Sequence, residues 1–341
     1  MTRQIMFIPL LMAAALLGSC GGTSSSSPDY MPAVIDLAKC QIADDNASVS
    51  HIDADRCKGA RENLASAYYS FGRSAYRKGD YREAILYYSK AIDIDPEIGY
   101  DIYLKRGALR DYLNDEEGAI ADYSRAILRK ADEIIPYKAR GDAYIRTGRY
   151  EKALEDYGEA IALGERDPDI FVLRGYAYGK LGRYEEAISA YDKAIEIKPD
   201  YAMAYFNRGH DYAELGRFEE AIASYDKAIT FRPNHAGTHT NRGVSNHELE
   251  RYEEAIADYD KALEINPDYG SAYNNRGVTY NELGRYEEAI SDYDKAIALK
   301  PNSGRYWRNR SRAKRALGDI KGAIRDCNHA KSFYTGLINC Y

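Results

Sequence analysis

The sequence predicts an all-α solenoid, in which short helical hairpins stack one after another. The alanine of an E-A-I-type segment returns every 34 residues from Ala119 to Ala323, and one earlier copy, Ala84, stands 35 residues before Ala119. Each period also holds two amphipathic segments with a turn between them. Self-similarity at a period of about 20–50 residues is typical of stacked repeats. Such an array presents long surfaces to a partner and needs no active-site pocket.

The segment from Gly270 to Pro301 shows the two helices of one period most clearly. Its first half places four residues on one helix face, at i, i+4, i+7 and i+10: Tyr273, Gly277, Tyr280 and Leu283. Gly284 then suits the left-handed residue just past a helix end. The second half carries its buried stripe on Tyr286, Ala289, Ile290, Tyr293, Ala296 and Ile297. Pro301 stops this second helix, so each period predicts one helical hairpin.

These residues resemble the tetratricopeptide repeat (TPR), whose motif has aromatic, Gly, aromatic, Ala, aromatic, Ala and Pro at the same offsets. Two more copies match throughout: Phe171, Gly175, Tyr178, Ala187, Tyr191, Ala194 and Pro199, then Tyr205, Gly209, Tyr212, Ala221, Tyr225, Ala228 and Pro233. We count eight copies over residues 65–337. The resemblance implies a TPR α-solenoid of about eight helix-turn-helix repeats in a right-handed superhelix. It also implies a concave groove lined mainly by the first helix of each repeat.

Departures from the motif gather toward the ends of the array. The second and third copies carry Ala131 and Glu165 in place of the closing proline. The eighth carries Trp307, Ser311 and Cys327 where other copies show Tyr, Gly and Tyr. Terminal repeats face solvent on one side, so unusual residues are expected there.

The first 20 residues have the architecture of a secretory signal. Arg3 precedes an apolar run from Ile5 to Leu17, which is too short to span a bilayer. The last four residues, Leu17-Gly18-Ser19-Cys20, resemble the bacterial lipobox. The resemblance implies a lipoprotein signal peptide over residues 1–19 and a lipid on Cys20. The alternative is a hydrophobic N-terminal helix that ends in a chance cysteine.

Residues 20–29 are rich in Gly and Ser and predict a flexible tether behind the lipidated cysteine. Because Gly21 rather than Asp follows that cysteine, the resemblance favours anchoring in the outer membrane over retention in the inner one. The expected location is therefore the outer membrane, with the protein on its periplasmic face.

Four cysteines remain beside Cys20, an even number that suits an oxidising compartment. Sequence proximity suggests a Cys40–Cys57 disulfide, which would close an N-terminal helical cap over residues 30–64. A Cys327–Cys340 disulfide would pin the C-terminal tail, residues 338–341, onto the last helix. The alternative is free buried thiols, particularly at Cys327, which occupies a core tyrosine position.

A row of asparagines is the candidate peptide-binding surface. They stand two residues before the repeat's glycine, or before Ser311 in the last copy, at Asn207, Asn241, Asn275 and Asn309. Each amide offers a donor and an acceptor, so the row suits the backbone of an extended peptide. The position resembles the asparagine ladder in the TPR domain of O-linked N-acetylglucosamine transferase, which implies peptide binding in the C-terminal half. The alternative is that these asparagines serve local helix contacts.

Beside this row, an arginine precedes the glycine in six copies and Ser311 in the last copy. Most second helices carry a nearby aspartate, such as Asp192, Asp226, Asp260 and Asp294. Ion pairing within the array is the expected role of the arginines, and binding of partner carboxylates is the alternative. The last repeat is unusually basic, with Arg305, Arg308, Arg310, Arg312, Lys314 and Arg315 in its first helix. A solvated cap and a site for an acidic partner or phospholipid headgroups both remain open.

Catalytic signatures are missing from the sequence, which has no Gly-rich phosphate loop, no G-x-S-x-G and no H-E-x-x-H. A net charge of −6 argues against broad nucleic-acid binding. His235 and His239 stand at i, i+4, and His210 and His247 lie in adjacent repeats. Because His239 takes a tyrosine position of the motif, we expect no metal site. We also expect no cofactor and no small-molecule substrate.

The sequence thus favours a non-catalytic, lipid-anchored periplasmic scaffold that binds envelope proteins or peptides in the concave groove. The alternative is a self-assembling structural envelope protein, in which arrays stack end to end.

Overall fold

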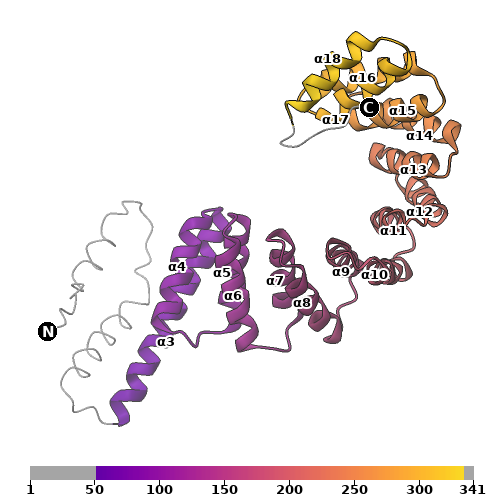
Figure 1. Cartoon of the computed structure of the whole chain (residues 1–341). Helices are drawn as coiled ribbons and strands as arrows, with labels where there is room; N and C mark the ends of the chain where they lie inside the picture. The colour runs from indigo at the N-terminus through magenta and orange to yellow at the C-terminus, as the bar shows by residue number, and fades with distance from the viewer. Residues whose placement is uncertain (1–50, 334–341) are drawn as a thin grey trace, which may run out of the picture. The chain divides into compact units, whose positions relative to one another are not determined.

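The computed structural model describes residues 51–333, and side chains from residue 55 onward. The described residues form sixteen helices and no strand (Figure 1). The predicted signal peptide, the tether, Cys20, Cys40, Cys340 and the C-terminal tail lie outside this range. The chain divides into two compact units, and the boundary lies between Thr147 and Gly148.

The described part of the first unit contains five helices: α3 (His51–Lys78), α4 (Tyr81–Ile94), α5 (Tyr100–Tyr112), α6 (Glu116–Arg129) and α7 (Ile134–Arg146). Helix α3 is 28 residues long. It runs without a break through residue 65, where the sequence placed the end of the cap and the start of the repeats. The described part of the predicted cap is therefore the N-terminal half of the first repeat's own first helix.

The second unit contains eleven described helices: α8 (Tyr150–Ala162), α9 (Pro168–Lys180), α10 (Tyr184–Ile197), α11 (Ala202–Glu214), α12 (Phe218–Phe231), α13 (Ala236–Glu248), α14 (Tyr252–Ile265), α15 (Gly270–Glu282), α16 (Tyr286–Leu299), α17 (Gly304–Ala316) and α18 (Ile320–Lys331). Repeats four to eight are the pairs α9/α10, α11/α12, α13/α14, α15/α16 and α17/α18. Within each pair the helices pack together, and each second helix also packs on the first helix of the next repeat. The predicted all-α array of eight consecutive helix-turn-helix repeats is confirmed, whereas the handedness of the whole array stays a prediction.

A left-handed residue ends the first helix of the repeats. Gly284 has the predicted positive φ, +71°, directly after the C-cap residue of α15. In repeats two and six the same position holds Asn114 and Glu250, which adopt φ of 61° and 59°. A side chain in this conformation is strained because its Cβ crowds the backbone carbonyl. The turn is therefore imposed on these two residues by the packing of the helices on either side.

The repeat glycine allows close approach of the two helices. A Cβ atom built on Gly277 would lie 2.8 Å from the ring of Tyr293, which is 1% exposed. The last repeat changes both partners together, because Ser311 stands opposite the smaller Cys327. Ser311 then uses its hydroxyl to donate to the backbone carbonyl of Ala323, at 2.7 Å. The unusual residues of the last repeat therefore form a matched pair.

A ring donor near the start of several first helices links consecutive repeats. The Tyr205 hydroxyl donates to the Pro199 carbonyl at 3.2 Å, and the Trp307 indole donates to the Pro301 carbonyl at 2.7 Å. His239 Nε2 lies 2.9 Å from the Pro233 carbonyl and takes the same role.

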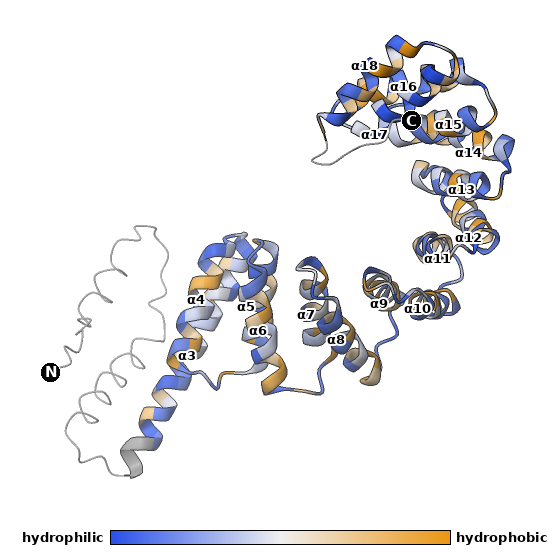
Figure 2. Cartoon of the chain, viewed as in Figure 1, coloured by the Kyte–Doolittle hydropathy of each residue, from blue (hydrophilic) through white to orange (hydrophobic). Residues whose placement is uncertain are grey.

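Apolar and hydrophilic residues alternate around the described helices (Figure 2), as expected for helices that bury one side.

Candidate functional site

Charged bridges between consecutive second helices organise repeats six to eight. Arg276 donates from Nε and Nη2 to Asp292 of its own repeat, both at 2.7 Å, and from Nη1 to Asp260 of the preceding repeat. Arg242 binds Asp258 and Asp226, and Arg310 binds Asp326 and Asp294, in the same way. We call this arrangement a double arginine bridge. Pairing within the array, the expected role of these arginines, is therefore confirmed for repeats six to eight.

The inner aspartates of these bridges are buried. Burial on its own would raise the pKa of Asp258. His239, 3.9 Å away, and hydrogen bonds from Arg242 and Asn246 outweigh that effect and hold the pKa below its usual value. Asp326 has a lowered pKa for the same reason, with Arg310 and Lys314 as donors. The aspartates predicted from the sequence to pair with the arginines are only the outer ones of each pair. The inner ones recur at the same 34-residue period, which is the signal that was overlooked.

The double arginine bridge is incomplete in repeats four and five. Arg208 binds Asp192 at 2.5 Å, but Ser224 replaces its inner aspartate. Arg174 has neither acid, because Ala190 and Gly158 occupy the two positions. Its Nη2 donates to the Tyr178 hydroxyl at 3.1 Å, and its buried Nε has no hydrogen-bond partner in the described part of the chain.

The four asparagines of the predicted row are all half-buried and differ in what they contact. Asn309 donates to the buried Asn274 at 2.9 Å, and Asn274 donates to Asn275 at 3.0 Å. Asn241 lies beside the phenol of Tyr225, where it opposes part of the rise in pKa that burial causes. Asn207 instead lines a pocket between repeats four and five. The C-terminal members therefore make local contacts, and peptide binding by the row stays a prediction.

Each histidine that had been weighed as a metal ligand has a protein partner. His235 lies 2.7 Å from the Thr238 hydroxyl, His247 2.9 Å from that of Thr279, and His210 3.2 Å from Asp211. Over residues 51–333 there is no group of three or more side chains that could hold a metal ion.

The two described cysteines, Cys57 and Cys327, are disulfide-bonded. Their proposed partners, Cys40 and Cys340, lie outside the described residues, so both pairings stay predictions.

In the basic last repeat, Arg310 and Lys314 both bind Asp326, and Arg312 is exposed. Part of that charge is therefore used within the fold.

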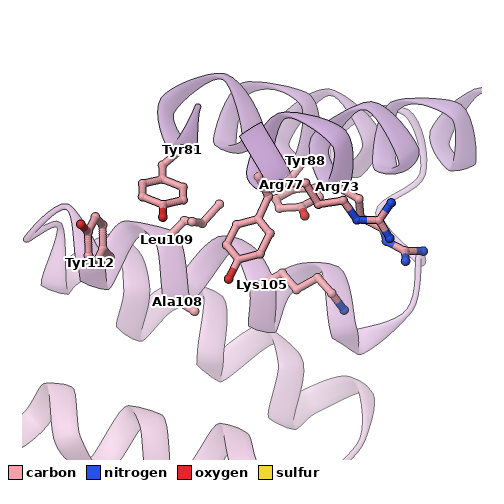
Figure 3. A pocket seen from close by; sticks show the side chains of 9 residues that line it. Arg73, Arg77, Tyr81, Tyr88, Lys105, Ala108, Leu109 and Tyr112 are labelled. Carbon is pink, nitrogen blue, oxygen red and sulfur yellow. The ribbon is translucent and has the colours of Figure 1, made fainter. Parts of the chain in front are cut away.

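An aromatic and basic pocket lies in the first unit (Figure 3). It has a volume of about 610 Å³ and is formed by α3, α4 and α5. Tyr81 and Tyr112 lie at one end, and the cationic groups of Arg73, Arg77 and Lys105 lie at the other. We call it the basic pocket.

Two features make the basic pocket available to a ligand. Two of its tyrosines, Tyr76 and Tyr112, are 54% and 69% exposed. Lys105 pairs with Asp101 at 3.0 Å, whereas Arg73 and Arg77 form no ion pair within residues 55–333. The pocket therefore offers ring faces and unneutralised positive charge. The asparagine row, which the sequence predicts as the binding surface, lies in the other half of the chain.

No helix among the described residues is both long enough and apolar enough to cross a membrane. No curated protein matches the chain. Solved structures are similar to it, among them a tetratricopeptide repeat protein from Parabacteroides merdae, with 18% identity, 78% of this chain and 98% of that chain covered, and a TM-score of 0.55. YrrB, described as a TPR protein with an unusual peptide-binding site, has 27% identity over 54% of this chain and 95% of its own, with a TM-score of 0.48. MamA has 24% identity over 50% of this chain and 94% of its own, with a TM-score of 0.48.

Models of the tetratricopeptide repeat match residues 65–98, 138–202, 202–235 and 270–303, and a model of the TPR repeat matches residues 245–284. Together they cover more than half of the chain. The similarity to the Parabacteroides merdae structure supports the same fold. The chain therefore belongs to the tetratricopeptide repeat family.

Proposed function

We propose that this protein is a lipid-anchored scaffold that holds envelope proteins or their peptide segments against its first-helix face. Membership of the repeat family supports a protein-interaction scaffold, and this fold generally serves interaction rather than catalysis. The observation that carries the proposal is the basic pocket, because exposed tyrosines and unpaired arginines line a concave surface of the first helices. Tyrosine and arginine are the residues that most often dominate binding energy at protein interfaces.

The proposed location is the periplasmic face of the outer membrane. The lipobox-like sequence ending at Cys20 supports a lipid anchor, and the Gly- and Ser-rich segment behind it supports a flexible tether. Tethering would raise the local concentration of a bound partner near the membrane, which assists its encounters without any chemical step. The location is tested by fractionating envelopes that contain the wild-type chain or Cys20→Ala. Recovery of both in the same membrane fraction would contradict the anchor.

Binding is tested with the detergent-solubilised full chain by crosslinking to envelope proteins and identifying the crosslinked partners. We expect Tyr76→Ser with Tyr112→Ser to lose partners that wild type retains, because both rings line the basic pocket. The matched control is Leu128→Ser with Ile135→Ser, which removes two exposed apolar side chains of the same unit outside the pocket. Loss of the same partners in the control, or of none in the tyrosine variant, would contradict binding through this pocket.

The asparagine row needs its own comparison, since its members differ in their contacts. Asn207→Ala removes an amide that lines a pocket, whereas Asn309→Ala removes a hydrogen bond to Asn274. If the row binds peptide backbone, partner binding falls in Asn207→Ala without a change in stability. Unchanged binding after all four replacements would rule out the row.

A further inference from the structure

A second pocket lies in the second unit, where α9 and α10 meet α11. Its volume is about 450 Å³, within the range of about 300–1,000 Å³ that is usual for ligand sites. Three tyrosines and one phenylalanine line it: Tyr176, Tyr184, Tyr191 and Phe206. Two carboxylates, Asp211 and Glu214, also line it. We call it the acidic pocket.

Two departures from the repeat create the acidic pocket. Asp211 stands two residues after the repeat glycine, where the other repeats have no charge: Ser74, Leu109, Ala143, Ala177, Ser245, Thr279 and Ala313. Gly179 stands four residues after the glycine of repeat four, where every other repeat has a side chain. A Cβ atom on Gly179 would lie 2.9 Å from Asp211 Oδ2. The glycine therefore leaves the space that the carboxylate fills.

Asp211 is buried without enough hydrogen-bond donors. It is 4% exposed, and its Oδ1 lies 3.2 Å from His210 Nδ1. Its other oxygen, Oδ2, is buried and has no partner within the described residues. Burial raises the pKa of Asp211 despite the opposing effect of His210. A buried carboxylate is costly unless a positive group or further donors stand beside it.

The remaining groups of the pocket suit a positive group from outside. Glu214 adds a second carboxylate, 3.9 Å from His210 Nε2. The only lysine that lines the pocket, Lys180, is exposed and forms no ion pair within the described part of the chain. Its ammonium group lies 5.1 Å from the centre of the Tyr176 ring, so a ring of this pocket already faces a cation.

We propose that the acidic pocket binds a cationic side chain of the partner protein, arginine in preference to lysine. This inference rests on the proposed function, because it names the side chain that anchors a partner on the first-helix face. A guanidinium is planar and carries five donors, so one group can lie against a tyrosine ring while its charge compensates Asp211 and Glu214.

The probes for the test are fluorescent nine-residue peptides, chosen by selecting a displayed random library on the detergent-solubilised full chain. We expect selected peptides to share a basic residue at one position. Replacing arginine there by citrulline keeps the shape and removes the charge, and should weaken binding to wild type at least tenfold. The same exchange should change binding to Asp211→Ala less than twofold. Lysine should bind more weakly than arginine and more tightly than norleucine.

The variants and the control distinguish a loss of folding, a loss of charge and a loss of partner binding. Asp211→Ala introduces the residue found at this position in repeats three, four and eight, and Gly179→Ala is a second variant that crowds the carboxylate instead of removing it. Asp200→Asn, an exposed acid outside the pocket, is the charge-matched control and should keep the full preference for arginine. Equal binding of arginine and citrulline peptides to wild type would overturn the cationic pocket alone. A failure to select any peptide would overturn the proposed function as well.

Discussion

Repeats four and five differ from repeats six to eight in how completely their charged side chains are paired. In the later repeats, every arginine before the repeat glycine, or before Ser311, joins two aspartates on consecutive second helices. In repeats four and five, Arg174 has no acid partner, Arg208 has one, and Asp211 is buried with an unpaired oxygen. The acidic pocket lies in this second region. If the acidic pocket binds a partner as proposed, recognition lies where the regular charge pairing of the array is interrupted.

The strongest test of this comparison removes one arginine from each region. Arg276→Met leaves Asp292 buried without its bidentate partner, and we expect the free energy of unfolding around α16 to fall by about 3–5 kcal/mol. Arg174→Met removes an arginine that has no acid partner, and the fall should stay below about 1 kcal/mol. Native-state hydrogen exchange reports the local values, which is necessary because repeat arrays do not unfold in one step. Equal losses would show that the two regions do not differ energetically.

The second test concerns Asp211, whose burial should destabilise the unoccupied array. Asp211→Ala is expected to raise the free energy of unfolding at pH 8 by about 1–3 kcal/mol, the usual penalty of a buried polar group without partners. Denaturation by urea at a series of pH values measures it. The gain should be absent from Asp200→Asn. A loss of stability in Asp211→Ala would mean that the carboxylate has a partner that supports the fold.

The pH dependence of that gain has a definite sign. His210 beside the carboxylate has a raised pKa, and so has Asp211. A group with a raised pKa contributes stability below its unfolded pKa and loses it as the pH rises through its folded pKa. Lys180 and Glu214 also face Asp211 and have opposing effects on its pKa. The gain in Asp211→Ala should therefore shrink as the pH falls from 8 through the raised pKa of His210.

Asp258 in repeat six has a lowered pKa and behaves in the opposite way. Its contribution is present above the usual aspartate pKa of about 3.9 and is lost as the pH falls through the lowered value. Because the pKa of Asp326 is lowered as well, acidification should weaken the double arginine bridges of repeats six and eight.

The helices of the array could be predicted from the sequence, but the buried aspartates of the double arginine bridges could not. The 34-residue period, Gly284 and the closing prolines were enough to place the helices, because helix ends depend on local backbone chemistry. The inner aspartates were missed because two acids two residues apart, such as Asp258 and Asp260, point to different sides of a helix. Which of them is buried depends on the packing of the next repeat. Local signals do not contain that information.

The candidate sites were harder to predict for a related reason. Asn309 was chosen as part of a row, but its amide meets Asn274, a residue that the motif does not single out. The acidic pocket depends on Gly179 in one repeat and Asp211 in the next. Neither residue is unusual on its own. The pocket forms only because Gly179 and Asp211 lie next to each other on two packed helices. Comparing each position with its equivalents in the other repeats would have drawn attention to both.

The third test restores regular pairing to repeat four. Ala190→Asp places an acid where repeats six to eight carry Asp258, Asp292 and Asp326. The buried Nε of Arg174, which has no hydrogen-bond partner within the described residues, can donate to this acid. We expect the free energy of unfolding around α10 to rise by about 1 kcal/mol, since a charged hydrogen bond gains somewhat more than the burial of the new carboxylate costs. Ala190→Asp in the Arg174→Met background completes a double-mutant cycle and should lose the gain. A gain that persists without Arg174 would contradict the bridge.

The smallest expected effect concerns the backbone of repeat six, which lies among the fully paired repeats. It tests whether turn geometry contributes to stability apart from charge pairing. Glu250 in repeat six holds a left-handed turn, with φ of 59°, which glycine holds in repeats four, five, seven and eight. Glu250→Gly relieves the strain but also increases the freedom of the unfolded chain, so the net gain should be only about 0.5 kcal/mol. Asn114→Gly should gain less, because asparagine tolerates this conformation better than glutamate. Chemical denaturation of both variants measures the difference. If Glu250→Gly gained more than Ala190→Asp, backbone strain rather than incomplete charge pairing would be the main irregularity of the array.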